Sequence, residues 1–259
     1  HKRSQENGTL ESGIRLALTA ILSSPSFLLR GEEQLLENSE NLDIDEYSLA
    51  SRLSYFLWSS TPDAALLKMA REGNLRKNLR PTIDRMLNDP KSERFITNFV
   101  GQWLQTRDVE AKFFDTPHVL GIDDGNKARQ IFNLYTRQDM RKETELFLSY
   151  LIRENRPAVE MITANYSFIN DRLAKFYGIQ KFEGQQFRKV SLEGHPRPGG
   201  ILTQGSFLTV TSNPTRTSPV KRGLFVLDNI LGLPHAPAPP NIPDLEDTRS
   251  ELGKNATMR

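Results

Sequence analysis

Helix start and stop signals recur through the first 180 residues of this chain, and they limit its fold more than any other feature. A helix is expected over residues 45–58. The next helix, residues 64–71, follows Ser60-Thr61-Pro62-Asp63, which supplies an N-cap, a first-turn proline and an acid near the positive helix end. Gly73 then marks its end. Repeated signals of this kind predict a mainly α protein.

Apolar residues at helical spacing predict the other helices of this front part. They are expected over residues 12–29 with a break or restart at Ser24-Pro25-Ser26, and over residues 81–87, 92–104, 126–153 and 168–177, the last stopped by Gly178. In the helix over residues 45–58, the side chains expected to face inward are Leu49, Leu53, Phe56 and Leu57.

The pattern changes after Gly178. Residues 186–192 alternate like a short strand, and residues 201–211 fit a helix or a strand equally well. Ser218 and Pro219 open a helix that reaches Gly232. We therefore expect an irregular multi-helix bundle followed by a smaller, turn-rich segment with one helix and little or no sheet.

These patterns predict four parts. Residues 1–40 form an N-terminal helix that belongs to the tail of a preceding domain, residues 41–180 a helical domain, and residues 181–233 a smaller C-terminal domain. Residues 234–259 form a proline-rich linker toward a further domain, with Pro234 to Pro243 favouring polyproline II. The chain opens inside a helical run without an initiator Met, so we expect an interior piece of a larger protein.

Composition excludes several classes of site. The 259 residues carry 34 basic and 32 acidic side chains, so no overall field attracts nucleic acid. The absence of cysteine excludes disulfides, thiolate metal sites, Cys nucleophiles and c-type haem attachment within these residues. No apolar run approaches the roughly 20 residues that span a bilayer, so no transmembrane segment is expected.

The loop over residues 211–223 is the best candidate site. Its cations and hydroxyls suit a carboxylate, a phosphate or a haem propionate, and the residues expected to bind an anion or a partner are Arg216, Thr217, Ser218, Lys221 and Arg222. The structural alternative is that Thr217 or Ser218 caps a helix while Arg216 and Arg222 pair with acids of the front domain. The spacing does not match a Walker loop.

Other candidate residues favour structural roles. His1, His118, His195 and His235 lack a ligand partner at metal-binding spacing, so no metal site is expected. Glu143 shares a helix face with Asp139, and the nearby Arg137 and Arg141 suggest an ion-pair lattice at a surface or between domains. Aromatic residues at helical spacing fit a core better than a sugar or haem platform. No residue is assigned a catalytic role.

Four stretches of the front part carry a family resemblance. They are Tyr47-Ser-Leu-Ala-Ser-Arg-Leu-Ser-Tyr-Phe-Leu-Trp-Ser-Ser-Thr-Pro-Asp63, Asn98-Phe-Val-Gly-Gln-Trp-Leu104, Arg141-Lys-Glu-Thr-Glu-Leu-Phe147 and Asn165-Tyr-Ser-Phe-Ile-Asn-Asp-Arg-Leu-Ala-Lys-Phe-Tyr-Gly-Ile179. They resemble a domain of unknown function found in large exported proteins of planctomycete type. Gly199-Gly-Ile-Leu-Thr-Gln-Gly205, Thr217-Ser-Pro-Val-Lys-Arg-Gly223 and the proline-rich strip are similar to the domain that follows it there.

The resemblance implies an architecture. Such proteins carry cytochrome-c-like domains, including one with a Cys-x-x-Cys-His motif beyond the proline-rich strip. No cofactor is expected in this chain, and haem c would lie in flanking domains. The implied partners are those domains or a haem-bearing subunit, and the implied location is outside the cytoplasm, in the periplasm or at the cell surface.

Three functions remain open at this stage. The first is a structural and docking module that supports electron transfer in neighbouring haem domains, and it predicts an apolar or basic patch near the ends of the chain. The second is an enzyme acting on extracellular polysaccharide or another polymer, which predicts a cleft with converging acids. The third is a protein- or glycan-binding module with a shallow aromatic surface. We favour the first because the polar loop and the proline-rich strip lie where a further domain would join.

Overall fold

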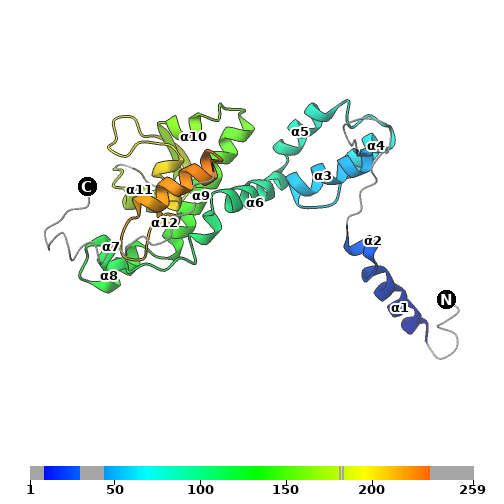
Figure 1. Ribbon diagram of the computed structural model, residues 1–259, viewed down its shortest axis with the longest axis horizontal. Coiled ribbons are helices and arrows are strands. Elements are labelled where there is room, and N and C mark those ends of the chain that lie inside the picture. The colour runs from blue at the N-terminus through cyan, green and yellow to red at the C-terminus, as the bar shows by residue number, and fades with distance from the viewer. Residues whose placement is uncertain (1–8, 30–43, 181, 183, 234–259) are drawn as a thin grey trace, which may run out of the picture. The chain divides into compact units, whose positions relative to one another are not determined.

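The structure is a computed structural model that describes residues 9–29, 44–180, 182 and 184–233. The fold divides between Phe95 and Ile96 into a first unit, residues 1–95, and a second unit, residues 96–259. Helices dominate the described residues, with one two-stranded sheet (Figure 1). The predicted fold class, mainly α with little sheet, is confirmed. The predicted domain division near residue 180 stays a prediction.

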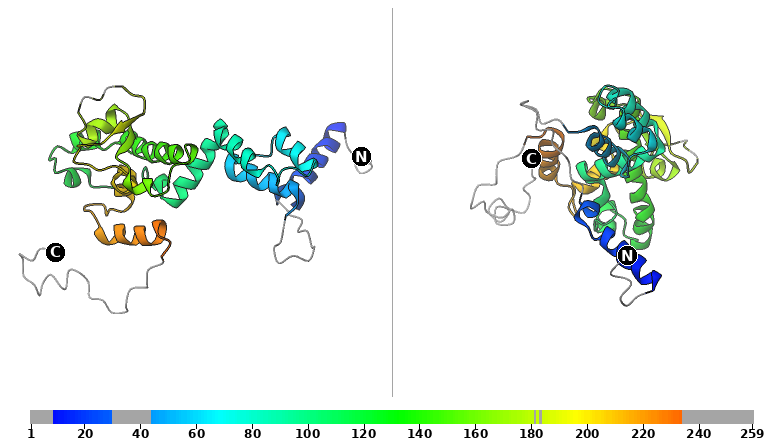
Figure 2. Two further views of the ribbon diagram at one scale, coloured as in Figure 1. Left: turned by 90° about the horizontal axis from the view of Figure 1, so that it is seen from above. Right: turned by 90° about the vertical axis from the view of Figure 1, so that its right-hand side faces the viewer.

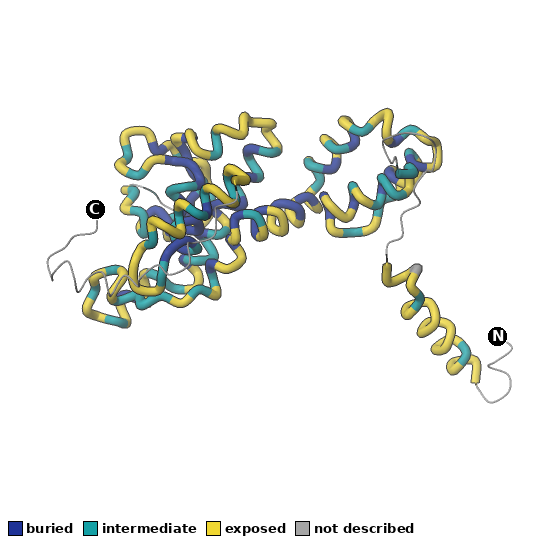
Figure 3. The backbone as a smooth tube through the Cα atoms, viewed as in Figure 1, coloured by how far each residue is buried: buried dark blue, intermediate teal, exposed yellow. Residues whose placement is uncertain are grey.

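The first helical run breaks where the sequence predicts. α1 (Leu10–Leu22) is capped by Thr9, and α2 (Pro25–Leu28) restarts with Pro25 in its first turn. No residue of α1 is buried (Figure 3).

Three further helices pack within the first unit. They are α3 (Glu46–Trp58), α4 (Ala64–Arg71) and α5 (Leu79–Asn88), followed by the short η2 (Pro90–Ser92). Asp45 caps α3, and Asp63 caps α4 by accepting from the Leu66 amide at 2.8 Å. The predicted start signal is therefore displaced: Asp63, expected as an acid of the first turn, is the cap, and Pro62, expected in the first turn, precedes the helix.

One inward-facing residue of α3 was predicted wrongly. Phe56 is 61% exposed, whereas Leu57 and Trp58 are buried. Trp58 is fully buried, and its Nε1–H donates to the Met86 carbonyl at 2.9 Å. The buried face of α3 therefore includes Trp58 and faces α5. The spacing of apolar residues alone does not reveal this face, because the end of the helix is mostly apolar.

The second unit contains most of the remaining elements. α6 (Glu93–Trp103) crosses the division, and the following elements are η3 (Thr106–Asp108), α7 (Thr116–Leu120), α8 (Gly125–Ile131), α9 (Leu134–Arg153), α10 (Glu160–Thr163), β1 (Tyr166–Ile169), α11 (Asp171–Tyr177), β2 (Arg188–Ser191), η4 (Ile201–Thr203), α12 (Gly205–Val210), α13 (Pro219–Phe225) and η5 (Val226–Ile230). α9 contacts β1, α10, α11 and α12 (Figure 2).

Two predicted helices of this unit differ from the structure. The helix expected over residues 126–153 is divided into α8 and α9, because the Asn133 side chain accepts from the Thr136 amide and starts a new helix. The helix expected over residues 168–177 is α11 alone, capped by Asn170, and Phe168 lies in β1. Gly178 ends α11 with a φ of 71°, as predicted.

The segments after Gly178 are short. β2 confirms the predicted strand and pairs antiparallel with β1, Tyr166 opposite Ser191. Residues 201–211, left open between helix and strand, are mainly helical as η4 and α12. The helix opened by Ser218 and Pro219 continues as α13 and the wider turns of η5.

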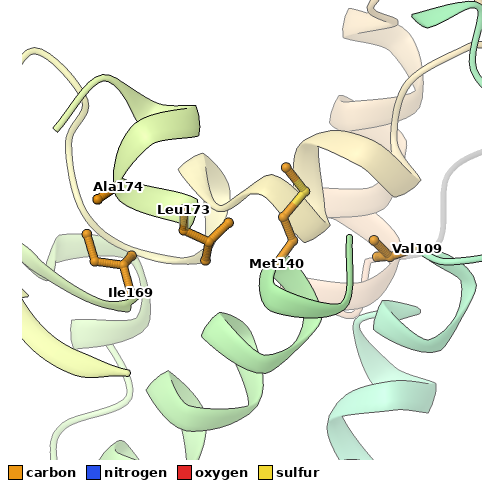
Figure 4. Close-up of a cluster of buried hydrophobic side chains, with 5 residues drawn as sticks. All are labelled: Val109, Met140, Ile169, Leu173 and Ala174. Carbon is orange, nitrogen blue, oxygen red and sulfur yellow. The ribbon is translucent and has the colours of Figure 1, made fainter. Parts of the chain in front are cut away.

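A small apolar cluster links these elements. Val109, Met140, Ile169, Leu173 and Ala174 are buried together. Met140 of α9 lies between Leu173 and Val109 (Figure 4). The N-terminal half of α9 therefore packs in the centre of the second unit, next to α11.

Candidate functional site

A buried carboxylate lies at the middle of α9. Glu143 is fully buried, and its Oε1 accepts from Ser167 Oγ at 2.5 Å and pairs with Arg197 Nη2 at 3.0 Å. The Tyr177 hydroxyl donates to the other oxygen, Oε2, at 2.6 Å. Residues from α9, β1, α11 and the loop after β2 thus converge on one charge.

The loop after β2 brings Arg197 to this carboxylate. Its path passes so close to Ala164 that a Cβ on Gly199 would lie 2.1 Å from the Ala164 carbonyl oxygen. Gly200 follows with a φ of 81°, a conformation that favours glycine. The pair Gly199-Gly200 therefore allows the chain to run against the β1 strand and to place Arg197 inside the unit.

Arg197 is held by three contacts and keeps one free donor. Its guanidinium carbon lies 3.9 Å from the centre of the Tyr177 ring, a cation–π geometry. Its Nε donates to the Thr203 carbonyl at 3.2 Å, and Nη2 pairs with Glu143. Nη1 is buried and has no hydrogen-bond partner among the described residues. The side chain is thus fixed while the Nη1 amino group remains available as a donor.

Burial raises the pKa of Tyr177 well above its usual value, and the adjacent negative charge of Glu143 raises this pKa further. The Tyr177 hydroxyl also accepts from the Gly205 amide at 2.9 Å. It therefore remains a protonated donor at neutral pH and has no tendency to act as a base.

The raised tyrosine pKa predicts a loss of stability in alkali. The folded state binds the Tyr177 proton more tightly than the unfolded chain, where the pKa is about 10. The contribution of Tyr177 to the free energy of unfolding is therefore fully present below pH 10. It falls as the pH rises above 10, by up to about 1.4 kcal/mol per pH unit. Burial also raises the pKa of Tyr166 to about 12, which adds an effect of the same sign. Urea unfolding at a series of pH values checks this. Tyr177→Phe should lose less stability between about pH 9 and 11 than the wild type, and equal losses would contradict the assignment.

A second polar cluster lies beside the first. Thr144 Oγ1 donates to Gln204 Oε1 at 2.6 Å and lies 2.5 Å from Ser206 Oγ, which is then the donor of that pair. All three residues are buried. This cluster ties the start of α12 to α9, and its hydrogen bonds satisfy the buried hydroxyls of Thr144 and Ser206.

A cavity of about 430 Å³ opens next to Arg197. Its walls are predominantly apolar and are formed by Phe114, Thr116, Val119, Leu120, Phe132, Met140, Phe176, Tyr177, Arg197, Pro198, Leu202, Thr203, Gly205, Leu208, Thr209, Ser212, Thr217 and Arg222. Two side chains of this lining are charged, and they are the arginines Arg197 and Arg222. The cavity therefore offers positive charge and donors, and not the pair of facing acids that polysaccharide hydrolysis uses.

The predicted site residues are divided between this cavity and the surface. Thr217 and Arg222 line the cavity, and Arg222 points its Nε and Nη2 at the hydroxyls of Thr211 and Ser212, both at 3.4 Å. Ser218 caps α13 by accepting from the Lys221 amide at 3.3 Å, as the structural alternative expects.

Arg216 and Lys221 are exposed and lie outside the cavity lining. Anion or partner binding by the five predicted residues stays a prediction.

Glu143 and Arg197 are the functional candidates that sequence reasoning missed. The prediction is an ion-pair lattice of Asp139 and Glu143 with Arg137 and Arg141, at a surface or between domains. Glu143 is instead buried and pairs with Arg197, while Asp139 pairs with Arg172 at 3.1 Å and Arg141 with Glu110 at 2.5 Å. One signal was present. Glu143 lies three residues after Met140 and four before Phe147, both buried, so it shares their face of α9.

The histidines do not assemble a site in the described part of the chain. His195 Nδ1 accepts from the Arg197 amide at 3.1 Å, and His118 lies in α7. His1 and His235 lie outside the described residues. Across residues 9–29, 44–180, 182 and 184–233, no group of three His, Asp or Glu side chains could hold a metal ion.

Two known protein families match parts of the chain. Residues 44–179 match the family described as PSD4, a protein of unknown function (DUF1592). The chain belongs to this family. Residues 198–259 match a second family, PSCyt3, a protein of unknown function (DUF1588). The two matches confirm the predicted pair of domains of planctomycete type. No curated protein and no solved structure is significantly similar to the chain.

The DUF1592 match covers α3 to α11, and the DUF1588 match begins at Pro198, next to Arg197. Residues of both matched segments therefore line the cavity, and all of the lining residues lie in the second unit. Within the described residues, none of the helices combines the length and the apolar character that a bilayer crossing requires.

Proposed function

We propose that this chain is a structural and docking module of an exported, c-type-haem-associated multidomain protein, in which neighbouring domains carry out electron transfer. The observation that carries the proposal is a cationic surface beside exposed apolar side chains on α13 and η5. The membership in the DUF1592 family and the match to the DUF1588 family support it by resemblance.

Two positive charges of this surface, those of Lys112 and Lys221, lie close together. The pKa of Lys112 is lowered, first by burial and then by the positive charge of Lys221. The Lys112 ammonium donates to the Val210 carbonyl, and Lys221 and Arg216 are exposed. Within the described residues, no carboxylate forms an ion pair with these three cations. A partner with negative charge would relieve the repulsion between Lys112 and Lys221.

Apolar side chains stand beside these charges. Val220, Leu227 and Leu231 recur at helical spacing along α13 and η5 and are 71%, 38% and 55% exposed. We call Lys112, Arg216, Lys221 and these three apolar residues the docking surface. We propose that a haem-bearing domain binds this surface. Haem propionates and acidic side chains at a haem edge complement the cations, and an apolar rim complements Val220, Leu227 and Leu231.

The haem association is tested on the natural polypeptide that contains these residues. Its intact mass and its visible absorption spectrum should show a mass well above 29.5 kDa and a Soret band. A colourless polypeptide of about that mass would remove the haem-bearing neighbour and with it the proposed docking.

A further inference from the structure

The cavity of the second unit has the dimensions of a small-molecule site. Its volume of about 430 Å³ lies in the range of roughly 300–1,000 Å³ that is typical of ligand pockets. Its walls come from α7, α9, α11, η4, α12 and α13. The Glu143 and Thr144 clusters tie α9, α11, α12 and the loop that carries Arg197 together, so this part of the cavity wall is formed before any ligand arrives.

The two arginines of the lining are not equivalent. Arg197 is neutralised by Glu143, so its buried Nη1 can serve as a hydrogen-bond donor without adding net charge. Arg222 is half-buried, and its contacts are hydroxyl groups at 3.4 Å; within the described part of the chain no acid pairs with it. One uncompensated positive charge therefore faces a cavity whose remaining surface is mainly apolar.

We infer that this cavity binds a small amphipathic carboxylate, such as a medium-chain fatty acid. The apolar body packs among Phe132, Phe176 and Leu208, and the carboxylate pairs with Arg222. A charge-assisted hydrogen bond in a partly buried site is stronger than the same contact with a neutral group, so the carboxylate is preferred over an alcohol of equal length. An amine of equal length would place a second positive charge beside Arg222 and is rejected. This inference does not rest on the proposed docking.

Titration calorimetry of the 259-residue chain with decanoate, decanol and decylamine tests the inference. We expect saturable binding of decanoate at one site and at least about tenfold weaker binding of decanol, as loss of a charge-assisted contact implies. Arg222→Gln should weaken decanoate binding by a similar factor and leave decanol binding unchanged. The matched control is Arg216→Gln, which removes an exposed cation of the same loop outside the cavity and should leave decanoate binding unchanged.

A cavity-filling variant tests the position of the ligand. Leu208→Trp should abolish decanoate binding, and Leu202→Phe serves the same purpose if the larger substitution unfolds the unit. Absence of decanoate binding to the folded chain would overturn the inference. So would equal affinity for decanoate and decanol, which would show an apolar cavity without carboxylate selection, or binding that survives both filled variants, which would place the ligand elsewhere.

Discussion

Glu143→Ala is expected to lower the free energy of unfolding of the second unit by about 3–5 kcal/mol, the cost of removing one partner of a buried ion pair. The substitution leaves the Arg197 guanidinium inside the protein without its carboxylate, and it removes the acceptor of both Ser167 and Tyr177. Urea unfolding followed by tryptophan fluorescence measures the loss, because one of the two tryptophans, Trp103, lies in the second unit, where its Nε1–H donates to the Asn229 carbonyl at 2.6 Å.

The matched control for this change is Lys175→Ala. Lys175 pairs with Asp171 at 3.5 Å and its side chain is 78% exposed. Removal of this surface pair should cost at most about 0.5 kcal/mol. A double variant, Glu143→Leu with Arg197→Met, should recover much of the loss because no charge remains buried. A cost below about 1 kcal/mol for Glu143→Ala would contradict the buried ion pair.

Trp58→Ala is expected to destabilise the first unit by about 3–5 kcal/mol, the usual cost of emptying a large aromatic site in a core. Trp58 is fully buried, donates to the Met86 carbonyl at 2.9 Å, and carries Lys91 over its ring at 4.7 Å. It therefore joins α3 to α5 and η2. The net stability of a small domain is only about 5–15 kcal/mol, so this single change removes a large share of it.

Phe56→Ala is the matched control for Trp58→Ala. Phe56 is 61% exposed, and its ring lies 4.9 Å from that of Phe95. Loss of this aromatic pair should cost about 0.5–1.5 kcal/mol. Thermal unfolding by circular dichroism compares the two variants, and a larger effect for Phe56→Ala would mean that the helix faces the other way.

The sequence predicts secondary-structure elements better than it predicts the contacts between them. Local signals that act within a few residues predict the mainly α class and the break near Pro25. They also predict the end of α11 at Gly178 and the strand near residue 190. Asn133 and Asn170 start helices through their side chains, and apolar spacing alone does not reveal these two caps.

The candidate site was harder to predict for a physical reason. The Glu143 network joins residues up to 54 positions apart in the chain, as the Arg197 contact shows. Burial of a carboxylate depends on whether its distant partner arrives, and local spacing does not specify that partner. Thr217 and Arg222 were chosen for their chemistry and do line the cavity, whereas the cavity itself is formed by α7, α9 and α11, which spacing cannot bring together.

The proposed haem-bearing domain docks on the surface formed by Lys112, Arg216, Lys221, Val220, Leu227 and Leu231. Carbodiimide cross-linking of the natural polypeptide tests this contact, because the reagent joins a lysine amine to a carboxylate in contact with it. We expect Lys221 to become linked to a haem propionate or to an acid of the haem-bearing domain, far more often than the exposed Lys175. Cross-links from Lys221 that lead only to residues of this chain, or that are no more frequent than those from Lys175, would contradict it.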